Sequence, residues 1–135
     1  MLYRDRKDAG LRLAAEVRKY KDQNPLILAL PRGGVVVGYE LAHELQAPLD
    51  VVVVRKLGAP GNPEFGFGAI APGDVEYVDE RTVQSLGLNK EQVGEVVDRE
   101  RRELNRRMEA YRGDEPEPTI ENQTAILVDD GLATG

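Results

Sequence analysis

Apolar positions along the chain change their spacing several times, and these changes predict alternating helices and strands. Between residues 7 and 20, Leu11, Ala14 and Ala15 share one helical stripe, so an amphipathic helix is expected there. Apolar runs follow at residues 26–30, 49–54 and 125–128, and only the second is interrupted, by Asp50. Unbroken runs of Val, Ile and Leu are typical of strands buried on both faces of a parallel sheet. The pattern therefore predicts an α/β fold with a largely parallel sheet and flanking helices.

The part of the chain between the second and third runs carries start and stop signals for further elements. Residues 75–78 suit a short strand, and Asp79 is placed to cap a short helix after it. Asn89 begins a capping-box pattern for a longer helix that would end at Gly113. These two helices predict a helical hood or insertion around residues 79–113.

Composition and charge narrow the class of protein. The 135 residues, 41% of them hydrophobic, suit one small globular domain over residues 1–135. A formal net charge of -6 and a pI near 4.9 argue against nucleic-acid binding, which needs a basic surface. The chain has no cysteine, no secretory leader pattern and no apolar run of the roughly 20 residues that a membrane helix needs. A cytoplasmic protein with a small-molecule ligand, without membrane attachment, is expected.

The first candidate functional residues are Asp129 and Asp130, which directly follow the last apolar run. Open α/β sheets bind ligands at the carboxyl ends of their strands. The following loop offers backbone N–H groups and a hydroxyl for a phosphate, from Gly131, Ala133, Thr134 and Gly135. A sugar phosphate would suit this site, because its diol can face the carboxylates and its phosphate can face the loop. The alternative is an ordinary turn that ends a strand.

The first apolar run is followed at once by Pro31, Arg32, Gly33 and Gly34, and then by a predicted helix over residues 35–46. Two adjacent glycines permit backbone conformations that are closed to other residues, including those that aim consecutive N–H groups at an anion. Arg32 adds a fixed positive charge. The alternative is an ordinary tight turn between a strand and a helix.

The run at residues 49–54 ends in Arg55 and Lys56, which would lie at the same edge of the sheet and neutralise an anionic leaving group. The alternative is a solvated basic pair. Residues 57–69 hold too many glycines and prolines for a helix, and we expect them to form a mobile cover over the site. The single histidine, His43, falls inside the predicted helix at residues 35–46 and is not nominated as a base.

Four motifs together resemble those of the type I phosphoribosyltransferases, and of one predicted branch in particular. They are Asp-Arg-x-x-Ala-Gly at residues 5–10, Pro-Arg-Gly-Gly at 31–34, Arg-Lys-Leu-Gly-x-Pro-Gly-Asn-Pro-Glu at 55–64 and Val-Asp-Asp-Gly-x-Ala-Thr-Gly at 128–135. In the first motif, Asp5 and Arg6 are expected to cap the first helix. The resemblance implies a Rossmann-like core and transfer of a phosphoribosyl group from 5-phosphoribosyl 1-pyrophosphate to a nitrogenous base, in nucleotide salvage or related metabolism.

The resemblance also implies a role for each matching residue. Asp129, Asp130 and Lys56 would be catalytic. The residues that would bind substrate are Pro31, Arg32, Gly33, Gly34, Arg55, Lys56, Gly131, Ala133, Thr134 and Gly135. Mg2+ is the expected cofactor, held mainly through substrate oxygens, so no protein ligand is assigned to it directly.

The sequence departs from the family pattern because type I members continue past Thr-Gly into a helix and further strands. We therefore expect the C-terminal part of the sheet to be missing here. Three interpretations stay open: a transferase, a module that senses phosphoribosyl pyrophosphate or a nucleotide without turnover, and an inactive fragment. The last would need its missing segment or a second copy, as in a homodimer.

Overall fold

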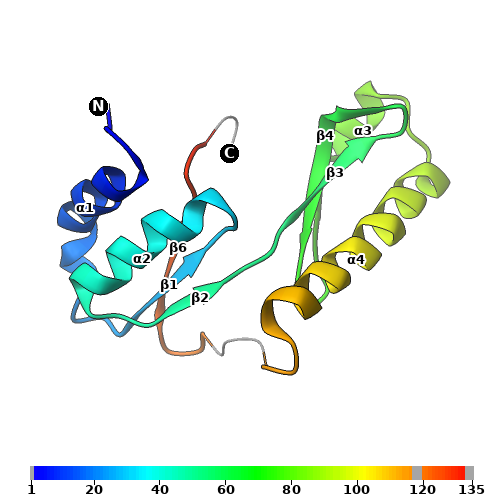
Figure 1. Ribbon diagram of the computed structural model, residues 1–135. Coiled ribbons are helices and arrows are strands. Elements are labelled where there is room, and N and C mark those ends of the chain that lie inside the picture. Colours follow the sequence, from blue (N-terminus) through cyan, green and yellow to red (C-terminus); the bar gives the residue numbers. More distant parts are fainter. Residues whose placement is uncertain (1, 117–119, 133–135) are drawn as a thin grey trace. The chain divides into compact units, whose positions relative to one another are not determined.

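The computed structural model describes residues 2–116 and 120–132 (Figure 1). Its contacts divide the chain into two compact units, and the outer parts of the chain build the first. That unit takes in Met1–Val52 and Pro116–Gly135, and the second takes in Val53–Glu115. The single domain expected from the sequence would comprise both units, and this stays a prediction.

A three-stranded parallel sheet forms the centre of the first unit. β1 (Pro25–Ala29) lies between β2 (Leu49–Val51) and β6 (Thr124–Val128), and both neighbours run parallel to it. Every residue of β1 is buried. The predicted α/β class with a parallel sheet is confirmed.

β6 differs from the expectation of a strand buried on both faces. Ile126 and Val128 pack against the core of the unit, whereas Ala125 and Leu127 are exposed, Leu127 to 66%. The reason is position: in the described part of the chain β6 pairs only with β1, so it lies at the sheet edge. A continuous apolar run shows that a strand can be covered on both faces, not that the cover is present.

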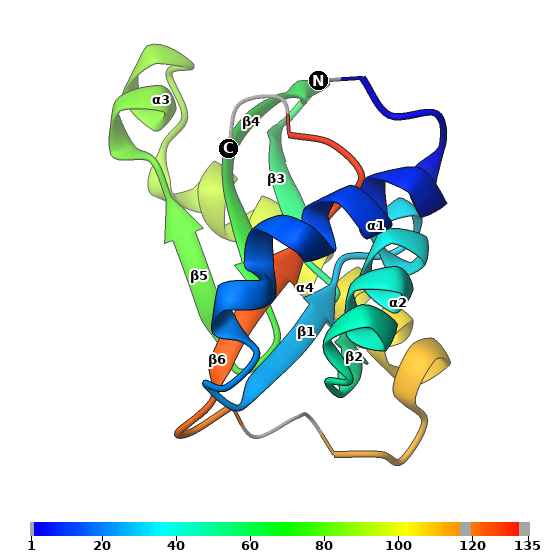
Figure 2. The same cartoon turned by 90° about the vertical axis from the view of Figure 1, so that its left-hand side faces the viewer.

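Two helices lie on one face of this sheet (Figure 2). α1 (Arg6–Val17), extended by the short 3-10 helix η1 (Arg18–Tyr20), packs on α2 (Gly33–Leu45), which in turn packs on all three strands. The core between them consists of Ala9, Ala14, Ile27, Val37, Leu41, Ala42, Leu45 and Val128. The predicted cap is confirmed, because the Asp5 side chain accepts a hydrogen bond from the N–H of Asp8 at 2.8 Å.

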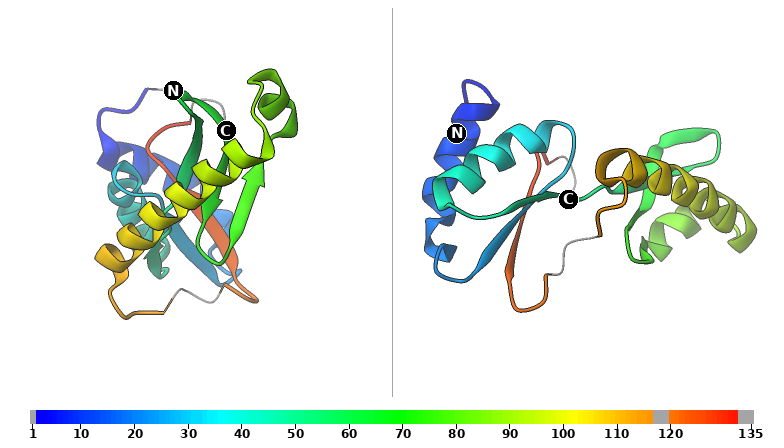
Figure 3. Two further views of the ribbon diagram at one scale, coloured as in Figure 1. Left: turned by 90° about the vertical axis from the view of Figure 1, so that its right-hand side faces the viewer. Right: turned by 60° about the horizontal axis from the view of Figure 1, so that its bottom comes forward.

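The second unit has an antiparallel sheet and two helices. β3 (Arg55–Ala59), β4 (Asn62–Ala71) and β5 (Val75–Val78) pair in that order, followed by α3 (Glu80–Ser85) and α4 (Lys90–Arg112). α4 lies along β3 and β4 (Figure 3, left). Both predicted caps are present, with Asp79 at α3 and a complete capping box of Asn89 and Gln92 at α4. The helical insertion predicted around residues 79–113 is thus confirmed.

The strand predicted at residues 49–54 is shorter than expected. It ends at Val51, although the N–H of Val52 still donates to the carbonyl of Ala29 at 3.0 Å. Arg55 and Lys56 then begin β3 of the antiparallel sheet instead of ending a parallel strand. β-branched residues favour extended backbone throughout such a run, and they do not mark where the chain leaves one sheet for another.

The glycine-rich stretch at residues 57–69 forms most of the β3–β4 hairpin, and its predicted role as a mobile cover over the site stays a prediction. The glycines allow close approach between the strands. A Cβ on Gly58 or Gly68 would collide with the backbone of the neighbouring strand, at Pro63 and Tyr77 respectively. The register shifts beside Gly58, where the hairpin has a bulge. The prediction that residues 57–69 do not form a helix is therefore confirmed.

Candidate functional site

The glycine turn after β1 and the acidic pair after β6 lie against each other at the carboxyl ends of two neighbouring strands. A Cβ added to Gly34 would lie 2.7 Å from the carbonyl oxygen of Val128 and 3.0 Å from the Cα of Asp129. A Cβ added to Gly33 would overlap the carboxylate of Asp130. The N–H of Leu30 also donates to the carbonyl of Val128 at 2.9 Å. Two motifs far apart in sequence therefore form one continuous surface.

This contact explains why glycine is required at both positions, and the explanation differs from the predicted one. Neither Gly33 nor Gly34 has a positive φ, and both belong to the first turn of α2. The expectation that they provide conformations closed to other residues was wrong. They are needed because a side chain at either position would occupy the space of the acidic loop. The peptide bond between Pro31 and Arg32, just before them, is cis.

Asp130 is held by an arginine from the start of α1. The Arg6 guanidinium donates to Oδ2 of Asp130 through Nη2 at 2.8 Å and through Nε at 3.3 Å. These hydrogen bonds are the main cause that lowers the pKa of Asp130 below its ordinary value. Both Arg6 donors go to Oδ2, so within the described part of the chain no arginine or lysine side chain donates a hydrogen bond to Oδ1 of Asp130. One oxygen is therefore fixed while the other stays available to a ligand.

Arg6 is the residue that sequence reasoning missed at this site. It was expected only to help cap the first helix, and it stands 124 positions from Asp130 in the sequence. Local spacing carries no signal for such a pair. The Asp-Arg-x-x-Ala-Gly motif was the one available hint, because a cap alone requires Asp5 and not the arginine after it.

Asp129 turns its carboxylate back onto its own loop. Its Oδ1 accepts a hydrogen bond from the backbone N–H of Asp130 at 2.8 Å. This bond holds the Asp129 carboxylate against the backbone of the next residue. Both residues are exposed at the surface of the first unit.

A cavity of about 750 Å³ opens beside the acidic pair, which is the size range of small-molecule sites. Asp129, Asp130 and Gly131 line it from the loop after β6, and Asp5 and Arg6 line it from the start of α1. The rest of the wall is mainly apolar, with Ala9, Leu13, Leu30, Val37, Leu127 and Leu132 among its residues. The predicted phosphate-loop residues Ala133, Thr134 and Gly135 lie outside the described residues.

Arg32 stands at the N-cap position of α2, next to the glycine pair. Its side chain is exposed and, within the described ranges, makes no hydrogen bond or ion pair. The first turn of α2 also presents the positive end of the helix dipole, although the N–H groups of Gly34 and Val35 donate to the carbonyls of Leu30 and Arg32. The structure thus places a free cation and an anion-attracting helix end beside the acidic pair.

Arg55 and Lys56, the other predicted substrate-binding cations, belong to the second unit. The Arg55 guanidinium donates to Oε2 of Glu100, with Nη2 at 2.7 Å and Nε at 2.9 Å. Lys56 donates to the carbonyl of Glu64 at 3.2 Å. These contacts account for both side chains inside their own unit, and their role toward a substrate stays a prediction.

Two further features bear on cofactors and on other sites. Among residues 2–116 and 120–132, no group of three or more acidic or histidine side chains could hold a metal ion.

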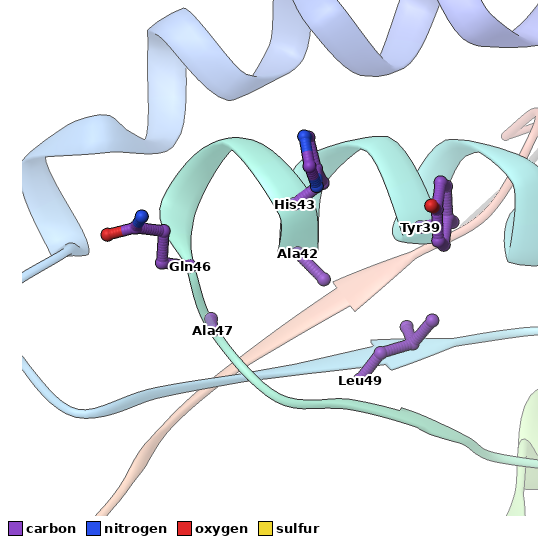
Figure 4. A pocket seen from close by; sticks show the side chains of 6 residues that line it. All are labelled: Tyr39, Ala42, His43, Gln46, Ala47 and Leu49. Atoms are coloured by element: carbon purple, nitrogen blue, oxygen red, sulfur yellow. The ribbon is translucent and has the colours of Figure 1, made fainter.

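A second hollow, of about 540 Å³, lies between α2 and β2, where the rings of Tyr39 and His43 stack with centroids 6.3 Å apart (Figure 4). His43 is in the C-terminal half of α2, whereas the acidic pair faces its N-terminal turn. In the described part of the chain no helix could cross a membrane.

Comparison with known proteins decides the family. A family model described as the phosphoribosyl transferase domain matches residues 2–135. This chain belongs to that family. Two relatives from strains of Mycobacterium tuberculosis, both named provisionally as phosphoribosyl transferases, are 42% identical over 134 residues. The match covers 99% of this chain and 30% of each relative, so the chain spans less than a third of their length.

A solved structure agrees with this assignment at the level of the fold. The crystal structure of TT1426 from Thermus thermophilus matches with a TM-score of 0.79 and 39% sequence identity. The match covers 96% of this chain and 62% of that one. The expected type I phosphoribosyltransferase-like fold is therefore confirmed.

Proposed function

We propose that this phosphoribosyl transferase domain binds 5-phosphoribosyl 1-pyrophosphate and transfers its phosphoribosyl group to a nitrogenous base, with release of pyrophosphate, in nucleotide salvage or related metabolism. The contact of Gly33 and Gly34 with the loop of Asp129 and Asp130 carries the proposal. It joins two carboxylates, which suit hydroxyl groups, to a helix N-terminus, which suits phosphate.

The ribose would face the acidic pair. Oδ1 of Asp130, which receives neither of the Arg6 donors, can accept a hydrogen bond from a ribose hydroxyl, and the Asp129 carboxylate stands beside it. Two carboxylates would also stabilise the positive charge that develops on the sugar ring as the leaving group departs. Fixed carboxylates supply this stabilisation without rearranging at the moment of reaction.

The phosphates would be divided between the two loops. Pro31, Arg32, Gly33 and Gly34 would hold the pyrophosphate at the start of α2, where Arg32 has no competing partner in the described part of the chain. Gly131, Ala133, Thr134 and Gly135 would hold the 5-phosphate. Arg55 and Lys56 would add positive charge toward the pyrophosphate.

Mg2+ suits this donor set. Magnesium sites commonly use one or two carboxylates together with substrate phosphates, and Asp129 and Asp130 are two adjacent exposed carboxylates. When bound, the ion would neutralise charge on the diphosphate. Most of its ligands would be substrate oxygens.

In the reaction, a nitrogen lone pair of the acceptor base forms a bond to C1 of the ribose. The bond from C1 to the pyrophosphate oxygen breaks, and the electron pair leaves with pyrophosphate. The chain would contribute positioning and charge stabilisation and no covalent group of its own. Holding both reactants in line is itself a large source of rate enhancement.

Calorimetric titration with phosphoribosyl pyrophosphate, with and without Mg2+, tests the proposal. We expect saturable binding that depends on Mg2+, and we expect it to weaken in Asp130→Asn while the melting temperature stays unchanged. Asp98→Asn is the matched control, because Asp98 is an exposed residue of α4. Lack of saturable binding by the parent chain would refute the proposal. Binding without pyrophosphate release for any purine or pyrimidine acceptor would point to a sensing module instead.

A further inference from the structure

The Asp-Arg-x-x-Ala-Gly motif at residues 5–10 connects the start of α1 to the acidic pair. Asp5 caps the helix by accepting the N–H of Asp8, so Arg6 is the first residue of α1. The carboxylate of Asp8 in turn accepts the backbone N–H of Arg4 at 3.0 Å, which ties down the segment that enters the helix. Arg6 therefore extends from a helix terminus whose backbone is fixed on both sides.

The end of the motif fixes α1 against α2. Ala9 is buried in the core of the first unit. A Cβ on Gly10 would lie 2.5 Å from the Cβ of Glu40 and 3.0 Å from the carbonyl oxygen of Val37, so only glycine allows the two helices to approach this closely. α2 is also the helix whose first turn contacts Asp130. The motif thus sets the distance between the Arg6 backbone and the site.

At the other end of this connection, the Asp130 carboxylate lies between two neighbours. Gly33 packs against it from the start of α2, and the Arg6 guanidinium binds its Oδ2 from the start of α1. Both N–H groups that Arg6 directs to the site go to this one oxygen. The other charged groups that line the same cavity are the carboxylates of Asp5 and Asp129.

We propose that Arg6 is a positioning residue, which holds Oδ2 of Asp130 so that Oδ1 faces the ribose hydroxyls of phosphoribosyl pyrophosphate. This inference rests on the proposed function and adds a residue to it. Arg6 acts through Asp130 and not as a ligand of the substrate phosphates, because the two N–H groups that it directs to the site, on Nε and Nη2, both bind this carboxylate. The planar fork of a guanidinium can direct two donors onto one carboxylate, whereas an ammonium group is a point charge.

A double-mutant cycle separates the two modes of action, with the affinity for phosphoribosyl pyrophosphate and Mg2+ as the readout in the full chain. Arg6→Gln should weaken binding about fivefold in the parent background. It should have no further effect in an Asp130→Asn background, because the group through which it acts is already altered. Arg6→Lys should recover only part of the loss. Arg12→Gln removes another arginine of α1 that pairs with Asp8, and it should leave the affinity unchanged.

A second readout needs no substrate. In NMR titrations of the ligand-free protein, Arg6→Gln should raise the pKa of the Asp130 carboxyl toward its ordinary value, whereas Arg12→Gln should not. Equal affinity in the parent and Arg6→Gln, or losses that simply add in the double mutant, would overturn the inference and leave the proposed function intact. Absence of binding by the parent would overturn the proposed function together with the inference.

Discussion

Replacement of Gly34 by alanine tests the central contact of the site directly. The new methyl carbon would lie 2.7 Å from the Val128 carbonyl oxygen, and ordinary contact begins at 3.4 Å, so the backbones must separate by about 0.7 Å. Such overpacking costs about 1–3 kcal/mol. Replacing a helical glycine returns about 0.5–1 kcal/mol. The expected net loss is therefore about 1–2 kcal/mol, which lowers the melting temperature by roughly 5 °C.

Two matched substitutions control for the general effect of removing a glycine. Gly94 lies inside α4, and a methyl carbon added there would have no neighbouring atom within 4 Å, so Gly94→Ala should raise stability by about 0.5–1 kcal/mol. Gly131 belongs to the first unit and also has open space around it, so Gly131→Ala should be close to neutral. Thermal unfolding followed by circular dichroism measures all three variants. If Gly34→Ala melts at or above the parent temperature, the close contact described here is wrong.

Three further predictions concern separate parts of the chain. Gly33→Ala should displace the Asp130 carboxylate and weaken binding of phosphoribosyl pyrophosphate at least about tenfold in calorimetry. It should cost less stability than Gly34→Ala, because the new methyl group meets a side chain and not a backbone carbonyl. Two arginines of α4 lower the pKa of Glu103 to about 2. The contribution of the Glu103 carboxylate to folding stability is therefore complete above pH 4.5 and is lost as the pH falls toward 2. Glu103→Gln should remove this part of the pH dependence of urea unfolding. Asn89→Ala removes one side of the capping box and should cost about 1 kcal/mol in the same assay, whereas full retention of stability would contradict the cap.

Elements with strong local signals were predictable from the sequence. The capping box of Asn89 and Gln92 and the cap at Asp79 act within a single helical turn, and both are present as expected. β1 was predictable because its apolar run is unbroken, as is typical of a strand covered on both faces, and every residue of β1 is buried. Each cap acts within its own helix, so these two helix starts need no information from distant residues.

Features that depend on distant partners were predicted less well. The end of β2 at Val51 is set by the passage of the chain into a second sheet, and nothing in a run of valines records that passage. The exposure of Leu127 depends on which neighbours surround β6. Gly33 and Gly34 were recognised as important for the wrong reason, since their requirement comes from a loop almost a hundred positions later.

The residues of the candidate site show the same difference between local signals and distant partners. Asp129, Asp130 and the glycine turn could be named because each follows an apolar run and each belongs to a motif of the family. The Arg6 contact could not, because the preference of a guanidinium for a carboxylate does not identify which carboxylate it meets. A motif residue without a local role, such as Arg6 beside a sufficient cap at Asp5, is a reason to search for a partner elsewhere in the chain.

The central place of β1 between an early and a late strand has a consequence for the order of folding. β2 follows β1 after a single helix, whereas pairing of Pro25 with Thr124 must close a loop on the order of a hundred residues, at an entropic cost of about 4 kcal/mol. During synthesis from the N-terminus, both helices of the first unit and two of its strands emerge well before β6. The nascent chain therefore carries the glycine turn of the candidate site long before its acidic pair. Prior folding of Val53–Glu115 would replace most of that flexible loop by a structured connector, so the second unit would assist the first kinetically.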